Sequence, residues 1–365
     1  MAKYKLGEIC EIVSGSTPKT GIAEYWDGNL KWITPAEIDD ESYIITDSAR
    51  KLTKLGVKKT GLSSFPSGTV ILSSRAPIGK VAIAGCKMYC NQGFKNLICS
   101  DRINNRYLYW FLKGNTAYLN SLGRGATFKE ISKKIVSDIE INVPEISQQL
   151  AAVDALERVS EIIRLRKNQL QKLDELIKAR FVELFGDPLT NPKGYQEKYL
   201  SEIAEYWNGL TYKPDDVANE GTIVLRSSNI QNASLDFADT VRVNCKIGTK
   251  KYVQDNDILM CSRNGSAKLV GKVALIKELS EPMSFGAFMM IIRSAYYPFL
   301  MTYFQLPAFR SQITTGATTT INQITGRMLD NVKLAIPDIE SAKDFSAFTN
   351  QVDKSKLLQF FCFPI

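Results

Sequence analysis

The sequence predicts an α+β protein: two homologous mixed α/β domains in tandem, joined by long coiled-coil-type spacer helices with pseudo-twofold symmetry. Two observations predict this class. The chain of 365 residues repeats itself at a period of about 190 residues, and an uninterrupted apolar heptad pattern lies between the two copies. At roughly 100–200 residues per domain, this length suits two domains.

Six strings of the first copy recur in the same order in the second copy, which chance does not explain. The matched strings are Leu6–Ile9 with Leu200–Ile203, Lys58-Lys59 with Lys250-Lys251, Ile71-Leu72 and Ser74-Arg75 with Ile258-Leu259 and Ser262-Arg263, Gly79–Ala82 with Gly271–Ala274, Gly125–Thr127 with Gly316–Thr318, and Ile141–Ile146 with Leu334–Ile339. We therefore expect domains at residues 1–145 and 187–338, a spacer helix at 146–186, and a shortened second helix with an apolar tail at 339–365.

Short β-branched runs bounded by glycine and proline predict strands in both copies. These runs are Val70–Ser73, Val81–Ala84, Ile258–Cys261 and Val273–Ile276. Aromatic and aliphatic residues at mixed spacing predict one helix in each copy, over Asn105–Leu119 and over Pro298–Ile313.

The segment between the copies predicts one long helix, because it contains no glycine or proline from Ser147 to Phe185. Ser147 is the expected N-cap and Gly186 the expected C′ residue. Apolar residues recur every seven positions, with Leu173 and Val159 at an intervening position, which is typical of a helix packed along another helix. The packing residues are Leu156, Ile163, Leu170, Leu173, Ile177 and Leu184.

A second helix is expected after the second copy. It begins with Ala342, Phe345, Phe348 and Val352 at helical spacing, and we expect about fifteen helical residues before the apolar segment 357–365. A partner this short would leave half of the long helix uncovered.

The formal charge of +8 is unevenly distributed. Residues 1–144 carry 20 basic and 13 acidic side chains, residues 145–185 carry 7 of each, and residues 186–337 carry 16 and 14. A neutral helix between two basic domains fits a rod that holds two polyanion-binding modules. A basic surplus that only maintains solubility is the alternative.

Composition excludes much catalytic chemistry. The chain has no histidine, which excludes a Ser-His-Asp triad, a Cys-His dyad and a histidine-ligated metal. It has no phosphate-binding loop motif and no GxGxxG motif, so we expect no catalytic, cofactor-binding or metal-binding residues. Seven cysteines, an odd number, indicate a reducing, cytoplasmic setting, and Cys86, Cys90 and Cys99, which form no CxxC pair, are expected to be buried free thiols. No leader or membrane span is expected.

Basic and hydroxyl residues recur at matched places in the two copies and suggest DNA contacts, because arginine reads guanine and hydroxyls hold phosphates. An arginine follows a strand in each copy, and a lysine follows a glycine. The candidate DNA-binding residues are Arg75, Lys80, Arg124, Thr127, Lys129, Arg263, Lys268, Lys272, Thr318 and Thr320. The alternative for each is an ordinary ion pair or turn.

With these features, the chain resembles a specificity subunit of a type I restriction-modification system along essentially its whole length. The resemblance is carried by Leu6–Glu8, Ser14–Pro18, Tyr25–Gly28, Arg75–Gly79, Asn91–Phe94, Gly125–Ile131 and Phe181–Pro188. The second copy departs from it, with Tyr206–Thr211 in place of the Ser-Gly-x-Thr-Pro string and Arg263-Asn264-Gly265 in place of Arg75-Ala76-Pro77.

The resemblance implies that each domain is a target recognition domain that reads one half of a bipartite site in double-stranded DNA. The spacer helices would set the distance between the halves and dock two methyltransferase (modification) subunits and a restriction/translocase subunit. The chain itself would catalyse nothing, and S-adenosylmethionine, ATP and Mg²⁺ would belong to those partner subunits.

Other functions remain open at this point. The shortened second helix suggests a frameshifted or recombined gene, so the chain could be an inactive or phase-variable subunit, or could self-associate through the unpaired helix. A coiled-coil adaptor that binds only protein, and a stand-alone nuclease or methyltransferase, are the alternatives from other classes.

Overall fold

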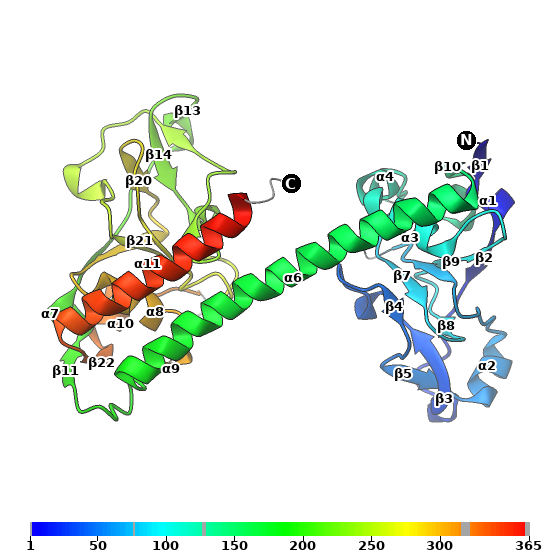
Figure 1. Cartoon of the computed structure of the whole chain (residues 1–365), viewed down its shortest axis with the longest axis horizontal. Helices are drawn as coiled ribbons and strands as arrows, with labels where there is room; N and C mark the ends of the chain where they lie inside the picture. The colour runs from blue at the N-terminus through cyan, green and yellow to red at the C-terminus, as the bar shows by residue number, and fades with distance from the viewer. Residues whose placement is uncertain (1, 76, 126–128, 315–321, 362–365) are drawn as a thin grey trace. The chain divides into compact units, whose positions relative to one another are not determined.

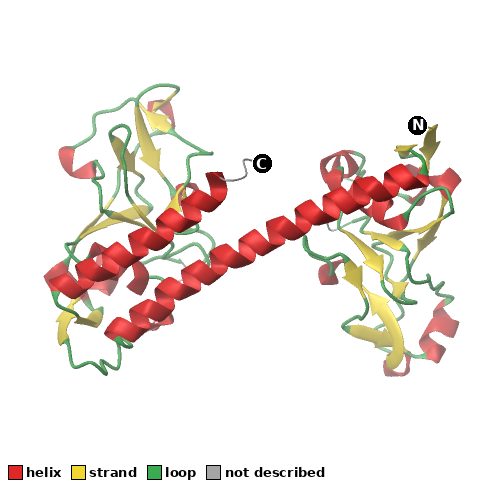
Figure 2. Cartoon of the chain, in the orientation of Figure 1, coloured by secondary structure: helices red, strands yellow, loops and turns green. Residues whose placement is uncertain are grey.

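A computed structural model of the chain describes residues 2–75, 77–125, 129–314 and 322–361 (Figure 1). The chain divides into two compact units, unit 1 at Met1–Leu165 and unit 2 at Arg166–Ile365. Both units mix helices with sheets (Figure 2), as the sequence predicted. Among the described residues, no helix is long and apolar enough to cross a membrane.

The described residues of unit 1 form ten strands and five shorter α-helices before the long helix. The strands are β1 (Ala2–Lys5), β2 (Cys10–Ser14), β3 (Trp26–Ile33), β4 (Ile44–Ile45), β5 (Arg50–Leu52), β6 (Val70–Leu72), β7 (Val81–Ala84), β8 (Tyr89–Cys90), β9 (Lys95–Cys99) and β10 (Glu140–Val143). The helices are α1 (Leu6–Ile9), α2 (Lys54–Thr60), α3 (Asn105–Gly114), α4 (Thr116–Ser121) and α5 (Lys133–Ser137).

The main sheet of unit 1 has five strands in the order β2-β9-β6-β7-β4. Strand β6 is buried on both faces because its residues alternate between two cores. Val70 and Leu72 join a cluster with Leu108 of α3, whereas Ile71 joins Phe65 in a second cluster. A three-stranded sheet, β5-β3-β8, and the β1-β10 pair complete the unit.

Unit 2 repeats this plan. Its strands are β11 (Gln196–Tyr199), β12 (Glu205–Asn208), β13 (Val217–Ala218), β14 (Thr222–Leu225), β15 (Ile230–Gln231), β16 (Ser234–Leu235), β17 (Arg242–Val243), β18 (Ile258–Cys261), β19 (Val273–Leu275), β20 (Met283–Phe285), β21 (Met289–Arg293) and β22 (Lys333–Ile336). Its helices are α7 (Leu200–Ile203), α8 (Tyr297–Tyr303), α9 (Pro307–Thr314), α10 (Gly326–Asp330) and α11 (Ile339–Phe361).

The main sheet of unit 2 is β12-β21-β18-β19, and β13-β17-β14-β20 forms the second sheet. Strand β18 alternates between two cores as β6 does. Met260 joins the aromatic residues of α8, and Leu259 joins Phe285 of β20. The internal repeat seen in the sequence is therefore a repeat of structure.

Two details of the strand and helix predictions were wrong. Ile71 faces Ala82 across its hairpin and Leu259 faces Ala274, so Ile71 corresponds to Leu259 and the match of Ile71 with Ile258 was one residue out of register. The helices expected over Asn105–Leu119 and Pro298–Ile313 are each broken into two. The first breaks at Asn115, and the second before Pro307, since proline begins a helix more readily than it continues one.

The long helix α6 spans Ile146–Phe185. It begins before Ser147, so the predicted N-cap was wrong, and the carbonyl of Glu145 accepts the N–H groups of Gln148 (2.9 Å) and Gln149 (3.0 Å). Gly186 ends the helix as predicted. Its φ is +74° and its N–H donates to the carbonyl of Val182 at 2.8 Å.

Polar contacts attach the first half of α6 to unit 1. The buried Gln149 side chain accepts the N–H of Asn104 at 2.8 Å and donates to the carbonyl of Pro144 at 2.8 Å. Glu157 accepts hydrogen bonds from Arg106, through Nε at 2.7 Å, and from the Tyr43 hydroxyl. Burial raises the pKa of Glu157, but these hydrogen bonds outweigh burial and hold that pKa below its usual value.

Aromatic packing attaches the second half of α6 to unit 2. Phe181 and Phe185 contact Phe345 of α11, with ring centroids 5.6 and 5.5 Å apart. Lys356 forms an ion pair with Asp174 at 2.6 Å, so α11 runs antiparallel to α6 (Figure 1). Helix α11 has 23 residues, longer than the fifteen expected.

The heptad stripe of α6 differs in burial along its length. Leu156 is 44% exposed and Ile163 is 38% exposed. Leu170 and Leu173 are half-buried. Further along, Ile177 and Leu184 are partly buried against the core of unit 2.

The aromatic cluster predicts the effect of truncating Phe345. Phe345→Ala should lower the free energy of unfolding of unit 2 by about 3–5 kcal/mol, because it removes a buried ring and leaves a cavity. Hydrogen exchange of unit 2 peptides in increasing urea measures this, and unit 1 peptides should keep their protection. Phe237→Ala, at a 46% exposed residue, is the control. Equal losses of unfolding free energy in the two variants would contradict the conclusion that Phe345 belongs to the stabilising aromatic core of unit 2.

The Arg106–Glu157 contact predicts a pH-dependent contribution to stability. Glu157→Gln should lower the free energy of unfolding of unit 1 by about 1–2 kcal/mol at pH 7. A carboxyl whose folded pKa is lowered stabilises above its unfolded pKa and loses this effect as the pH falls through the folded value. The difference from wild type, measured by hydrogen exchange in urea, should therefore shrink below about pH 4.5. Glu161→Gln, which affects an exposed pair with Arg164, should change little at either pH.

Candidate nucleic-acid interface

The arginine after β6 leaves the sheet of unit 1 at a point defined by two backbone hydrogen bonds. The N–H of Ser74 donates to the carbonyl of Gly93 at 2.7 Å, and the N–H of Ile131 donates to the carbonyl of Ser74 at 3.0 Å. Arg75 follows directly and is half-buried. Chain segments on both sides therefore hold the backbone at Arg75.

Unit 2 holds Arg263 in the same way. The N–H of Ser262 donates to the carbonyl of Phe288 at 2.9 Å, and the N–H of Ile324 donates to the carbonyl of Ser262 at 2.7 Å. Arg263 is exposed. The structure thus places the two predicted arginines at equivalent backbone positions.

A glycine turn in each hairpin positions the predicted lysines. Gly79 has a φ of +96° and Gly271 a φ of +78°, a conformation that favours glycine. Lys80 and Lys272 follow these glycines and are half-buried. The Lys80 ammonium donates to the carbonyl of Pro35 at 3.0 Å, so it also supports the neighbouring loop.

Arg75 belongs to a charged network in unit 1. Its guanidinium lies 3.6 Å from a carboxylate oxygen of Glu130. The other Glu130 oxygen accepts a hydrogen bond at 3.2 Å from Lys95, whose side chain is only 9% exposed. Lys95 also donates to the Ser74 hydroxyl at 3.2 Å. Two cations therefore share one carboxylate.

Arg263 has different surroundings in unit 2. Its guanidinium lies over the ring of Phe288, 5.3 Å from the centroid, and Phe288 is 60% exposed. The strand bridge that joins Arg75 to Glu130 joins Arg263 to Gln323, so a neutral amide replaces the carboxylate. Val70 pairs with Leu97 in unit 1 as Ile258 pairs with Ile292 in unit 2, so Met290 takes the place of Lys95.

A cleft of 1110 Å³ opens beside Arg263, within unit 2. Among its lining residues, Asn264 donates to the Ser227 hydroxyl at 3.2 Å. Arg226 donates to Asp239 at 2.8 Å. Phe288, which is 60% exposed, adds an aromatic surface to the lining. The cleft combines an aromatic face with amide and guanidinium donors.

The other predicted residues are distributed around these arginines. Arg124 is exposed and pairs through its backbone with Glu130, with hydrogen bonds of 3.0 and 2.9 Å, so the Glu130 backbone lies between Arg124 and Arg75. Lys129 and Lys268 are exposed, and Lys268 does not line the cleft. Thr127, Thr318 and Thr320 lie outside the described residues.

Unit 1 also presents an arginine on an aromatic face, which the sequence reasoning missed. The guanidinium of Arg50 lies 3.5 Å from the ring centroid of Trp26 and 5.7 Å from that of Trp32. The two indoles meet edge to face at 5.0 Å. Their N–H groups donate to the carbonyls of Lys19 and Ser16, which holds both rings in place.

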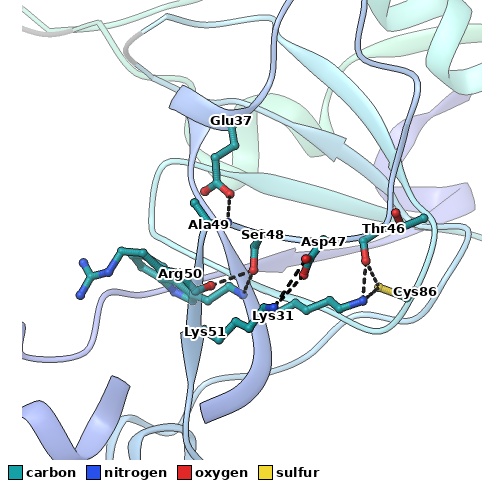
Figure 3. Close-up of polar contacts among 10 residues, drawn as sticks. Lys31, Glu37, Thr46, Asp47, Ser48, Ala49, Arg50, Lys51 and Cys86 are labelled. Atoms are coloured by element: carbon teal, nitrogen blue, oxygen red, sulfur yellow. Dashed lines mark hydrogen bonds and ion pairs between the residues drawn. The ribbon is translucent and has the colours of Figure 1, made fainter. Parts of the chain in front are cut away.

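Polar contacts fix the segment that leads to Arg50 (Figure 3). The N–H of Ala49 donates to Glu37 at 2.7 Å, and the Ser48 hydroxyl donates to the carbonyl of Arg50 at 2.7 Å. Lys31 donates to the carbonyl of Thr46 and to the Cys86 sulfur, the latter at 3.4 Å. Figure 3 shows the Arg50 guanidinium pointing away from these contacts.

The thiols and carboxylates of the described residues form no metal centre. Cys90 is buried, and burial raises the pKa of its thiol to about 12. Cys86 and Cys99 are only partly buried, so the expectation of buried thiols was wrong for these two. No group of three or more Cys, Asp or Glu residues that could hold a metal ion occurs in the part of the chain that the structure describes.

Comparison with known proteins identifies a family. The model of the type I restriction modification DNA specificity domain matches residues 1–175 and 192–359. The MjaIX specificity subunit of Methanocaldococcus jannaschii, a type I restriction enzyme subunit, is 36% identical over 223 residues, which are 56% of this chain and 52% of that relative. This chain thus spans about half of that relative's length.

More distant relatives cover more of the chain. The MjaVIII specificity subunit of the same organism is 20% identical over 371 residues, 96% of this chain and 85% of the relative. A solved structure from work on complex assembly and conformational transition of the type I R-M system has a TM-score of 0.56 at 18% identity. It covers 98% of this chain and 91% of that chain. At this identity the likeness shows a shared fold.

The Lys95–Glu130 network predicts a double-mutant effect. Glu130→Gln should destabilise unit 1 by about 1–3 kcal/mol, because the buried ammonium loses its counter-ion. Adding Lys95→Met, which copies Met290 and Gln323 of unit 2, should recover most of this loss. Urea denaturation with hydrogen exchange of unit 1 peptides measures both. Additive losses in the double variant would show that the two residues act independently.

Proposed function

Because the chain belongs to the type I restriction modification DNA specificity domain family, we propose that it is the sequence-specific DNA-binding subunit of a type I restriction-modification system. Each unit reads one half of a bipartite target in double-stranded DNA, and the helices set the distance between the halves. The observation that carries this proposal is the repeated placement of Arg75 and Arg263, by the same backbone hydrogen bonds, on units whose surrounding side chains differ. Equivalent backbones with different surfaces suit two different half-sites.

The candidate DNA-binding residues divide into two kinds. Arg124, Lys129 and Lys268 are exposed, which suits contacts with phosphates, whose attraction needs no fixed geometry. Arg75 and Arg263 are held at fixed backbone positions, which suits contacts with base edges, where donor direction decides specificity. Lys80 and Lys272 follow the glycine turns of the two hairpins and are half-buried. Thr127, Thr318 and Thr320 are proposed to add hydroxyl contacts.

Catalysis is proposed to reside on partner subunits. The chain would dock two methyltransferase (modification) subunits and a restriction/translocase subunit, which would use S-adenosylmethionine, ATP and Mg²⁺. The absence of histidine from the sequence agrees with a subunit that only recognises DNA. Cysteines without a CxxC pair agree with a reducing cytoplasm.

Exposed apolar residues on the first half of α6 support the docking part of the proposal. Leu156, Val159 and Ile162 are 44%, 54% and 53% exposed, and they lie on the helix between the domains. Clustered apolar exposure of this kind marks protein-binding surfaces. It is also the observation that favours the second candidate, an adaptor that binds protein and no DNA.

Salt dependence of DNA binding tests the proposal. The full chain should bind random-sequence duplex DNA, and the logarithm of its affinity should fall linearly with the logarithm of salt concentration. The double variant Arg124→Ala/Lys129→Ala should bind all sequences more weakly and reduce the slope by about 2. Fluorescence anisotropy over about 50–300 mM salt measures this slope. Arg158→Ala/Lys172→Ala, which removes two exposed cations of α6, should leave the slope unchanged.

Two results would contradict the proposal. Absence of salt-dependent affinity would favour the adaptor. Methylation or cleavage of DNA by the purified chain alone, given S-adenosylmethionine, ATP and Mg²⁺, would show that it is an enzyme.

A further inference from the structure

The cleft of unit 2 contains Arg263, whose guanidinium donates no hydrogen bond to any residue that the structure describes. Within the described part of the chain, no carboxylate forms an ion pair with Arg263, whereas Arg226 in the same cleft is tied to Asp239. Phe288 supports the Arg263 guanidinium through a cation–π contact at 5.3 Å. An aromatic ring restricts the guanidinium without using its N–H groups. The donor fork is therefore held in place, and no described residue occupies it, so it can bind a ligand.

The equivalent arginine of unit 1 shows what is particular to unit 2. Arg75 has Glu130 as its partner, and this carboxylate offsets its charge. In unit 2, Gln323 replaces Glu130 at the bridge position, and Phe288 occupies the position of Gly93 beside the strand end. An aromatic support has replaced an ionic one.

The cleft suits a neutral base edge better than a phosphate. The charges of Arg226 and Asp239 offset each other in the lining, so only the charge of Arg263 would attract a phosphate there. A base edge carries no net charge, and the amide groups of Asn264 and Asn322 in the lining can donate to it or accept from it. The guanidinium fork matches the O6 and N7 acceptors of guanine, which face the major groove.

We propose that this cleft is a base-recognition site, in which Arg263 reads a guanine of the half-site bound by unit 2 and Phe288 is its positioning residue. This inference rests on the proposed function and adds to it a residue that determines one base pair of the target. It also predicts that the two half-sites depend on different side-chain chemistry at the equivalent place.

Selection from a duplex DNA library with a randomised centre tests the proposal with the full chain, alone and reconstituted with its modification subunits. Wild type should enrich a bipartite motif. Arg263→Lys keeps the charge but loses the fork, so discrimination at one G·C pair in one half-site should fall by about 5- to 150-fold. The other half-site should be unchanged. Phe288→Ala should weaken the same base preference, and Phe288→Tyr, which keeps the aromatic face, should restore it.

The controls separate base reading from other roles. Arg327→Ala, which removes an exposed arginine of α10 in the same unit, should leave the motif intact. If the Arg263 and Phe288 variants are as thermally stable as wild type, unfolding does not explain their altered base preference. If Arg263→Lys selects the wild-type motif and Arg263→Ala weakens all sequences equally, Arg263 contacts phosphate and the inference is overturned. If wild type enriches no motif in either form, the proposed function fails, and the inference fails with it.

Discussion

The antiparallel pairing of one hairpin with a central strand determines where each unit presents its charged residues. β6 and β7 pair beside β9 in unit 1, and β18 and β19 pair beside β21 in unit 2. The register is fixed because β6 and β18 are buried on both faces, and a shift by one residue would exchange the two cores. The chain therefore leaves the sheet at a defined point, and an arginine stands there in both units.

Different side chains then act on the same backbone. Glu130 holds Arg75 by charge at 3.6 Å, whereas Phe288 holds Arg263 through its ring. The buried Lys95 belongs to the first arrangement, because Glu130 supplies the counter-charge that a buried ammonium needs. A duplicated fold can in this way keep its geometry while its two surfaces diverge in what they recognise.

Much of the fold could be predicted from the sequence, and less of the candidate site. The repeat and the strands Val81–Ala84 and Ile258–Cys261 were identified because burial and β-branching are local signals. The pairs Arg50 with Trp26 and Arg263 with Phe288 were missed, because residues about 25 positions apart meet only through strand pairing. The arginines were found by the repeat, but the groups that hold them were not. The proposed DNA contacts themselves stay predictions.

The heptad pattern of α6 shows the same limit on a larger scale. A stripe at seven-residue spacing predicts that a helix packs against something, but not along what length. In unit 2 the stripe ends in an aromatic cluster with α11. In unit 1 the helix is held by polar contacts of Gln149 and Glu157, while Leu156 stays exposed. The buried Val153 adds an apolar contact to these polar ones, whereas Leu156, Val159 and Ile162 remain exposed on the same helix. These exposed apolar residues are the surface on which the proposed partner subunits would dock.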